Sequence, residues 1–245
     1  MRKNDSIKAC GRTINYEIVY SKKRKKAAIV VRPDLSVEFR APHGLSREAI
    51  REMVQKKAAW VQEKLDWFEV NRLPCQEKEY TDGEKFLYLG KEYPLTVLPV
   101  EGIKKAFASF SGSEITVLLP KSAPEELKPS LVKKAVWNFY SECAEKEVEK
   151  FLKTYAEILN IDIPAFKVKH QKKRWGSCSA DNVLRINFQL MMAPPEQLEY
   201  VVVHEICHVK EKNHSVKFWD LVGELMPGYQ VHRKSLKKDG WRYVL

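Results

Sequence analysis

The stretch at residues 196–212, EQLEYVVVHEICHVKEK, narrows the fold more than any other part of the chain. Two prolines precede it, which is typical of a helix start. The valines at 201–203 indicate that the helix is buried. His204 and His208 are one helical turn apart, so their imidazoles lie on the same face. Because buried imidazoles need partners, one metal ion would satisfy both rings together.

The pentapeptide at residues 204–208, HEICH, matches the HExxH pattern. In that pattern two histidines bind a metal ion, and the glutamate between them reaches a water on the ion without binding the ion itself. Glu205 is therefore the candidate catalytic residue. The alternative is structural: two buried histidines paired with carboxylates or backbone groups.

A third histidine, His214, follows six residues after His208. If the helix ends near Glu211, a left-handed Asn213 would turn the chain back and bring His214 to the ion. Three histidines and a water form the open coordination of a catalytic zinc site. The alternative third ligand is a carboxylate on the following helix, Asp220 or Glu224.

The composition restricts the partners and the compartment. A formal net charge of +11 and a pI of about 9.3 favour acidic partners, which include nucleic acid, nucleotides, acidic peptides and membrane surfaces. The five cysteines form no CxxC pair, which argues against a disulfide framework and against a cysteine zinc cluster. No apolar run is long enough to cross a bilayer, and the N-terminus lacks a secretory pattern. We therefore expect a soluble, cytoplasmic protein with reduced cysteines.

Two segments of the first half resemble each other, residues 11–60 and 90–137. Each begins with Gly, continues with alternating apolar positions that predict strands, and ends in a helix with KKAAW or KKAVW. We interpret them as one β-β-β-α unit used twice and joined by a linker at 71–85; chance similarity of two ordinary hairpin–helix units is the alternative. This predicts a β-rich N-terminal region over residues 1–122 and an α+β domain over residues 123–245.

Two features of the first half bear on binding. The basic run SKKRKK at 21–26 is either a solvated hairpin turn or a contact for phosphate or an acidic partner. Trp60, Trp67 and Phe68 lie at helical spacing, which favours packing in the core or between modules over base stacking.

Further elements are predicted around the HEICH helix. A long helix is expected over residues 123–161, interrupted near Pro129. A β-hairpin is expected over 165–190, with WGSCS in its turn. A last helix is expected over 215–226, with Ser215 as its N-cap.

Four stretches of the second half resemble the YgjP-like zinc metallopeptidase domain family, which is related to the SprT-like proteases of the zincin class: RWGSCS (174–179), VLRINFQL (183–190), EYVVVHEICHVKEKNHSVKFW (199–219) and MPGY (226–229). The resemblance is dense over residues 165–232 and less specific in the first half. It implies an α+β, zincin-like metallohydrolase domain. It also implies zinc bound by His204, His208 and His214, with Glu205 catalytic.

These features indicate a zinc-dependent hydrolase, most simply a metallopeptidase in which Glu205 activates a water on the zinc. A second group that stabilises developing negative charge is also expected. Candidates for contact with the substrate or its transition state are Tyr229, His232, Arg233, Arg174 and Trp175.

The substrate is less constrained. The resemblance implies that the strand at 183–190 pairs with an extended peptide. The basic cluster KHQKKR at 169–174 favours an anionic substrate instead, so hydrolysis of a nucleoside triphosphate or similar small molecule is an alternative. A nucleic-acid-associated protease is another. A non-enzymatic nucleic-acid-binding protein with structural zinc is disfavoured, because structural zinc sites are closed and rich in cysteine.

Overall fold

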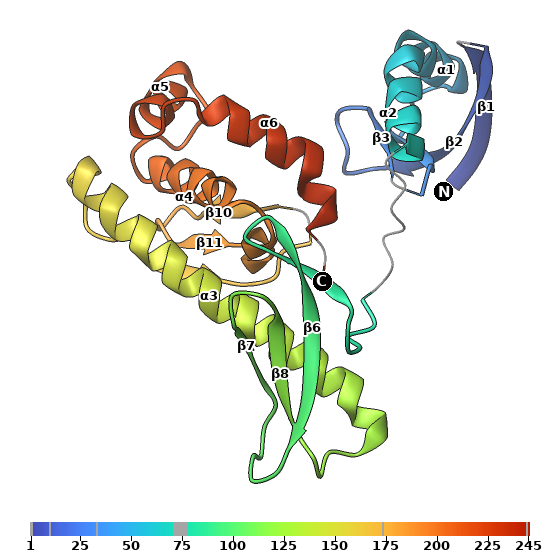
Figure 1. Ribbon diagram of the computed structural model, residues 1–245. Helices are drawn as coiled ribbons and strands as arrows, with labels where there is room; N and C mark the ends of the chain where they lie inside the picture. The colour runs from blue at the N-terminus through green and yellow to red at the C-terminus, as the bar shows by residue number, and fades with distance from the viewer. Residues whose placement is uncertain (1, 10, 33, 71–77, 173, 244) are drawn as a thin grey trace. The chain divides into compact units, whose positions relative to one another are not determined.

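The computed structural model describes residues 2–9, 11–32, 34–70, 78–172, 174–243 and 245. The chain forms two compact units, Met1–Gln76 and Glu77–Leu245, and each has its own hydrophobic core (Figure 1). Residues 71–77 of the predicted linker at 71–85 lie outside the described residues. Within the described residues, every helix is too short or too polar to cross a bilayer.

The first unit packs a four-stranded sheet against two helices. Its elements are β1 (Arg2–Ala9), β2 (Arg12–Ser21), β3 (Ala28–Val31), β4 (Val37–Pro42), α1 (Arg47–Lys56) and α2 (Ala58–Val70). Apolar residues alternate along β2, so Ile14, Tyr16 and Ile18 are buried on one face. Ile50 and Val54 lie one turn apart on α1 and join the same core.

A buried carboxylate ties α1 to β1. The Asp5 side chain is 3% exposed, and it accepts hydrogen bonds from Arg51 Nε at 3.0 Å and Arg47 Nε at 2.8 Å. The guanidinium groups of Arg51 and Arg47 hold the pKa of Asp5 well below its usual range. Because the folded-state pKa is lowered, the stabilisation is complete above the unfolded pKa of about 4. It is lost as the pH falls toward the folded-state value.

The second unit begins with another four-stranded sheet, followed by a long helix. The strands are β5 (Lys85–Tyr88), β6 (Lys91–Val100), β7 (Phe107–Phe110) and β8 (Ile115–Pro120); the 3-10 turn η1 (Glu125–Leu127) leads into α3 (Lys128–Leu159). The sequence predicted an interruption of this helix near Pro129, but the helix is continuous there. Pro129 lies in the first turn of α3, where its missing N–H removes no helical hydrogen bond.

The two four-stranded sheets have the same topology and register. Their orders are β1-β2-β4-β3 and β5-β6-β8-β7, with antiparallel, parallel and antiparallel pairs in turn. Gly11 and Gly90 occupy equivalent hairpin turns, one in each sheet. In each sheet, the residue ten positions after this glycine pairs with a proline at the end of a strand: Ser21 with Pro42, and Val100 with Pro120. Each sheet has four strands rather than the predicted three, because one strand precedes each glycine, outside the compared segments.

The division between the units lies earlier than the sequence suggested. The predicted regions were residues 1–122 and 123–245, whereas the compact units divide after Gln76. The reason is burial: Leu95 and Val117 of the second sheet share one core with Val136 of α3, so this sheet belongs with the C-terminal half.

The rest of the second unit completes an α+β fold, as predicted. Its elements are β9 (Phe166–Val168), β10 (Gly176–Cys178), β11 (Leu184–Ile186), the 3-10 turn η2 (Phe188–Met192), α4 (Pro195–Lys210), α5 (Val216–Leu225), α6 (Tyr229–Asp239) and the 3-10 turn η3 (Gly240–Arg242). The Ser215 hydroxyl accepts from the Phe218 N–H at 3.4 Å, which confirms the predicted N-cap of α5. The chain then forms α6, which the sequence analysis did not predict.

The repeated turn supplies a matched pair of substitutions. Gly90 has φ +81°, and a Cβ added there would lie 3.0 Å from Pro194 Cγ and 3.2 Å from Pro194 Cα, at the start of α4. Gly11 has φ +74° and open space around it. We expect Gly11→Ala to lower the free energy of unfolding by about 1 kcal/mol, the cost of the backbone conformation. Gly90→Ala should cost about 2–4 kcal/mol because overpacking is added.

Urea unfolding followed by circular dichroism compares the two variants with the unsubstituted chain. Equal losses of unfolding free energy in the two variants would contradict this prediction. They would mean that the hairpin can move away from Pro194 at no energetic cost.

Candidate metal and catalytic site

Helix α4 carries the HEICH segment through the interior of the second unit. The helix contacts α3, α5, α6 and β10. Tyr200, the valines at 201–203, Ile206 and Cys207 are buried, as the sequence pattern predicted. The helix ends at Lys210, and Glu211 follows in an extended conformation with φ −121° and ψ 99°.

Three histidines converge at the end of this helix. The candidate ligand atoms of His204, His208 and His214 all lie within 4.8 Å of one another, and the Nε2 atoms of His204 and His214 are 3.0 Å apart. Phe218 of α5 packs against the group, with its ring centroid 4.4 Å from that of His208. The alternative ligands Asp220 and Glu224 belong to no such group among the described residues.

The loop that delivers His214 differs from the predicted one. The prediction of a left-handed Asn213 was wrong, since the non-glycine residues with positive φ in the described part of the chain lie elsewhere. The extended Glu211 already directs the chain away from the helix axis, so no left-handed residue is needed. The Ser215 N–H then donates to the Asn213 carbonyl at 2.8 Å and closes the turn before α5.

The three imidazoles suit a divalent metal ion. The Nδ1 of His208 lies 3.0 Å from the Glu211 carbonyl oxygen, so Nδ1 carries the proton and the Nε2 lone pair is available. Burial, together with the neighbouring His208 and His214, lowers the pKa of His204 to about 3. Burial also lowers the pKa of His214. Neutral imidazoles are the form that binds zinc.

Glu205 is buried beside the histidines but lies outside their group. It is 5% exposed, and burial raises the pKa of its carboxyl group to about 7, against the opposing effects of the Arg174 charge and the Cys178 backbone N–H. Its carboxyl group lies against the backbone of Gly176, where an added Cβ would be 2.6 Å from Glu205 Oε1. Only glycine at this position allows the approach, so Gly176 positions the candidate base.

The predicted hairpin over 165–190 is a three-stranded sheet. Its order is β10-β11-β9, with β10 antiparallel to β11 and β11 parallel to β9. The WGSCS segment therefore forms strand β10, and the turn follows it, with Asn182 at φ 60°. The strand predicted at 183–190 is only β11, after which the chain forms η2. Because β11 is central, β10 is the edge strand beside the site.

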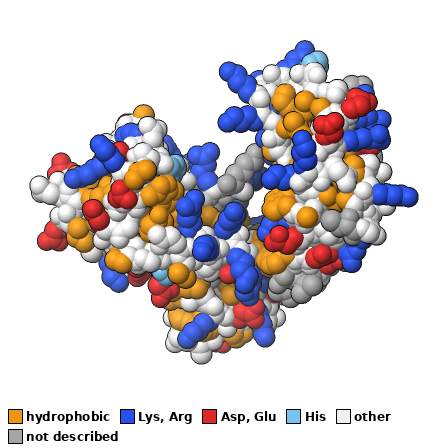
Figure 2. All heavy atoms as spheres, turned by 90° about the horizontal axis from the view of Figure 1, so that it is seen from above, with side chains coloured by type: hydrophobic (Ala, Val, Ile, Leu, Met, Phe, Trp, Pro, Cys, Tyr) orange, Lys and Arg blue, Asp and Glu red, His pale blue; other side chains and the backbone are white. Residues whose placement is uncertain are grey.

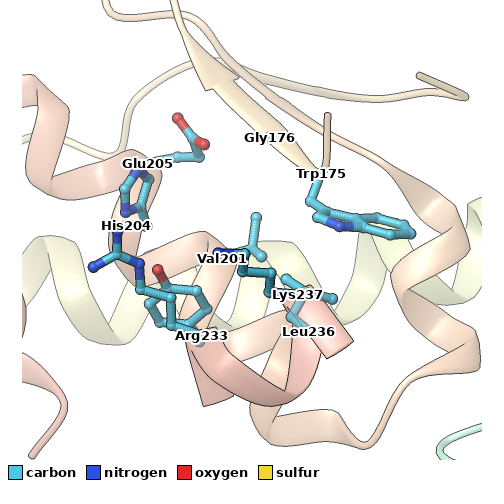
Figure 3. A pocket seen from close by; sticks show the side chains of 9 residues that line it. Trp175, Gly176, Val201, His204, Glu205, Arg233, Leu236 and Lys237 are labelled. Atoms are coloured by element: carbon cyan, nitrogen blue, oxygen red, sulfur yellow. The ribbon is translucent and has the colours of Figure 1, made fainter. Parts of the chain in front are cut away.

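A cavity of about 360 Å³ opens beside His204 and Glu205 (Figure 3). Its other lining residues come from the β10 segment, α4 and α6: Trp175, Gly176, Tyr200, Val201, Arg233, Leu236 and Lys237. Arg233 and Lys237 lie one turn apart on α6, so two cations face the same cavity. Figure 3 shows the Arg233 guanidinium directed toward His204.

Some of the residues predicted to contact the substrate line this cavity, and others do not. Trp175 and Arg233 line the cavity, and Arg174 lies close enough to act on the Glu205 charge. Tyr229 is buried in an aromatic stack, with its ring 5.5 Å from that of Trp219, and is not among the lining residues. His232 is not among them either.

Sequence reasoning missed Gly176 as a positioning residue, and Tyr200 and Lys237 as lining residues. Burial raises the pKa of Tyr200 to about 12, so its hydroxyl keeps its proton at the cavity wall. The spacing of Arg233 and Lys237 would have indicated a shared face if α6 had been predicted.

Metal content tests the histidine group directly. Because the group offers three converging donors, we expect the chain to bind about one zinc ion and His204→Ala to lose most of it. His43→Ala, an exposed histidine of the first unit, is the matched control and should keep it. Inductively coupled plasma mass spectrometry after zinc loading and desalting measures the ratio. Unchanged zinc in His204→Ala would place the metal elsewhere.

Comparisons with known proteins identify the family of the chain. No curated protein matches the chain. Two solved structures show limited similarity: the metallopeptidase zymogens abylysin of Pyrococcus abyssi (23% identity, TM-score 0.34, 37% of this chain and 93% of that chain) and jannalysin of Methanocaldococcus jannaschii (24% identity, TM-score 0.34, 39% and 96%). The YgjP-like, metallopeptidase domain family matches residues 25–239. The chain therefore belongs to the YgjP-like metallopeptidase domain family.

Proposed function

We propose that this chain is a zinc-dependent metallopeptidase in which Glu205 is the general base. The observation that carries the proposal is the placement of a buried carboxyl group, with its pKa raised to about 7, beside three converging imidazoles and a cavity. A base whose pKa lies near the working pH is suited to proton transfer.

Zinc would be held by His204, His208 and His214, where it supplies Lewis acidity for the substrate carbonyl and for water. Glu205 accepts a proton from the attacking water and returns it to the leaving amine. Its orientation is supported by the Gly176 backbone and by the Cys178 N–H.

Strand β10 offers the substrate a place to bind. It is the edge of its sheet, and Gly176 at its start lines the cavity. An extended peptide that pairs with this edge would pass Glu205. Arg233 faces the cavity from α6, and its guanidinium is held over the Trp219 ring at 4.3 Å, which makes it the candidate for stabilising negative charge on the substrate.

A second candidate function is hydrolysis of an anionic small molecule such as a nucleoside triphosphate. The observation in its favour is the pair Arg233 and Lys237 in the cavity beside Glu205. An adjacent cavity of about 390 Å³ shares Trp175 and Lys237 with the first, and Arg174 also lines it. Cations that line adjacent cavities suit phosphate groups.

A parallel substrate screen separates the two functions. Zinc-loaded protein is incubated with denatured casein, short peptides and nucleoside triphosphates, with Glu205→Gln as the matched control. We expect peptide-bond cleavage by the unsubstituted chain and a loss of at least about 100-fold in Glu205→Gln with zinc retained. Cleavage of nucleotides alone would replace the peptidase proposal by the second candidate. Full activity in Glu205→Gln would exclude Glu205 as the base.

Gly176→Ala tests the positioning of Glu205 without changing any titratable group. The added methyl group would occupy the place of the Glu205 carboxyl group. We expect zinc content to be unchanged and hydrolysis to fall about 100-fold, since a displacement of about 1 Å has effects of that size. Ser177→Ala, one residue along β10, is the control. Equal activity in both variants would show that the approach is not needed.

A further inference from the structure

The first unit has an apolar groove that the candidate metal site does not use. It is a cavity of about 500 Å³ lined by Ala28 and Ile29 of β3, Met53 of α1, Trp60 of α2 and other residues. Met53 is 41% exposed and Trp60 is 40% exposed, so Trp60 does not belong to the core of the first unit. Among the described residues, Trp60 makes no ring contact and no side-chain hydrogen bond. The Trp60 ring forms one apolar patch with Met53 and Ile29 around the cavity, and an exposed apolar patch marks a binding surface.

The second unit shows what covers the same position. Trp137, in KKAVW, corresponds to Trp60, in KKAAW, and follows a sheet of the same register. Its Nε1 donates to the Tyr80 hydroxyl at 2.8 Å, and its ring packs edge-on against His170 at 5.2 Å and Phe188 at 5.5 Å. This position therefore accepts aromatic side chains from another segment of polypeptide.

An unpaired strand edge borders the groove. Strand β3 is the last strand of its sheet and pairs only with β4 among the described residues. Its outer edge thus presents alternating N–H and C=O groups beside Trp60 and Met53. Their spacing fits another polypeptide strand.

The net positive charge of the first unit favours an acidic partner. Residues 1–76 hold 17 of the 43 Lys and Arg but 9 of the 32 Asp and Glu, so they carry +8 of the net +11. Lys56 and Lys57 line the groove, and the basic run at 21–26 leads directly into β3. Figure 2 shows Lys and Arg side chains beside apolar and acidic ones on one face of the molecule.

We infer that the first unit binds an extended acidic peptide segment that carries a large apolar side chain. The segment adds to the outer edge of β3, and its apolar side chain enters the groove between Met53 and Trp60. Its carboxylates pair with Lys56 and Lys57. The strand edge favours this partner over single-stranded nucleic acid, which has no backbone ladder to pair with β3. The inference does not depend on the metal site of the second unit.

Fluorescence anisotropy tests the inference on the whole 245-residue chain in the Glu205→Gln background, which keeps the probe intact. The probe is a labelled dodecapeptide with Asp and Glu residues around one Phe. Replacing its Phe by Ala, or its acids by amides, should weaken binding about tenfold. Trp60→Ala should weaken it by a similar factor, and Met53→Asp places a like charge in the groove and should do the same.

The matched control for charge is the double variant Lys3→Glu, Lys8→Glu on β1, at the opposite edge of the sheet. It is compared with the double variant Lys56→Glu, Lys57→Glu in the groove. The groove variants should lose binding, whereas the β1 variants should stay within about twofold. Hydrogen exchange should show protection of the amides of residues 28–31 when the peptide is bound.

Three results would overturn the inference. The first is equal weakening by the β1 and groove lysine variants, which would mean unspecific attraction. The second is full binding by both Trp60→Ala and Met53→Asp. The third is tighter binding of an oligothymidine probe with the same dependence on the groove variants, which would assign the groove to nucleic acid.

Discussion

The contact between the Glu205 carboxyl group and the backbone of β10 is the constraint on which the rest of the candidate site depends. It requires residue 176 to lack a side chain, because a Cβ there would overlap the Glu205 side chain. Glu205 is also buried at this contact, and burial raises the pKa of its carboxyl group. His204 and His208 lie on the same helix, so their positions are set together with that of Glu205. A shift of α4 would therefore disturb all three groups at once.

Local patterns predicted the centre of the site, whereas its walls come from long-range packing. The one-turn spacing of His204 and His208, the valines before them and the Ser215 cap are properties of short segments, and each is visible in the sequence. The parallel pairing of β9 with β11 skips the strand between them, and no local signal specifies it. Helix α6 was missed because its residues, YQVHRKSLKKD, bury little apolar surface: only Tyr229 and Leu236 are buried.

The sequence indicated two similar units, with chance similarity as the alternative, but it did not indicate their different roles. In the second unit the hairpin at Gly90 donates backbone hydrogen bonds to the η2 segment, and Trp137 is covered by aromatic rings. In the first unit Gly11 has open space and Trp60 remains exposed. The domain boundary was misplaced for the same reason, since similar strands are buried by different neighbours. One arrangement of strands thus packs into the core beside the candidate site in the second unit and presents an open edge in the first.

The Glu211–Ser215 loop has a consequence for the kinetics of metal exchange. The Glu211 carbonyl sets the tautomer of His208, and the same short loop delivers His214. Fraying of the last turn of α4 would remove one donor atom and misorient another in a single step. Capture and release of an ion at this site would then be cooperative with the folding of a few residues, and the exchange rate would follow the opening rate of the loop rather than the strength of any one bond.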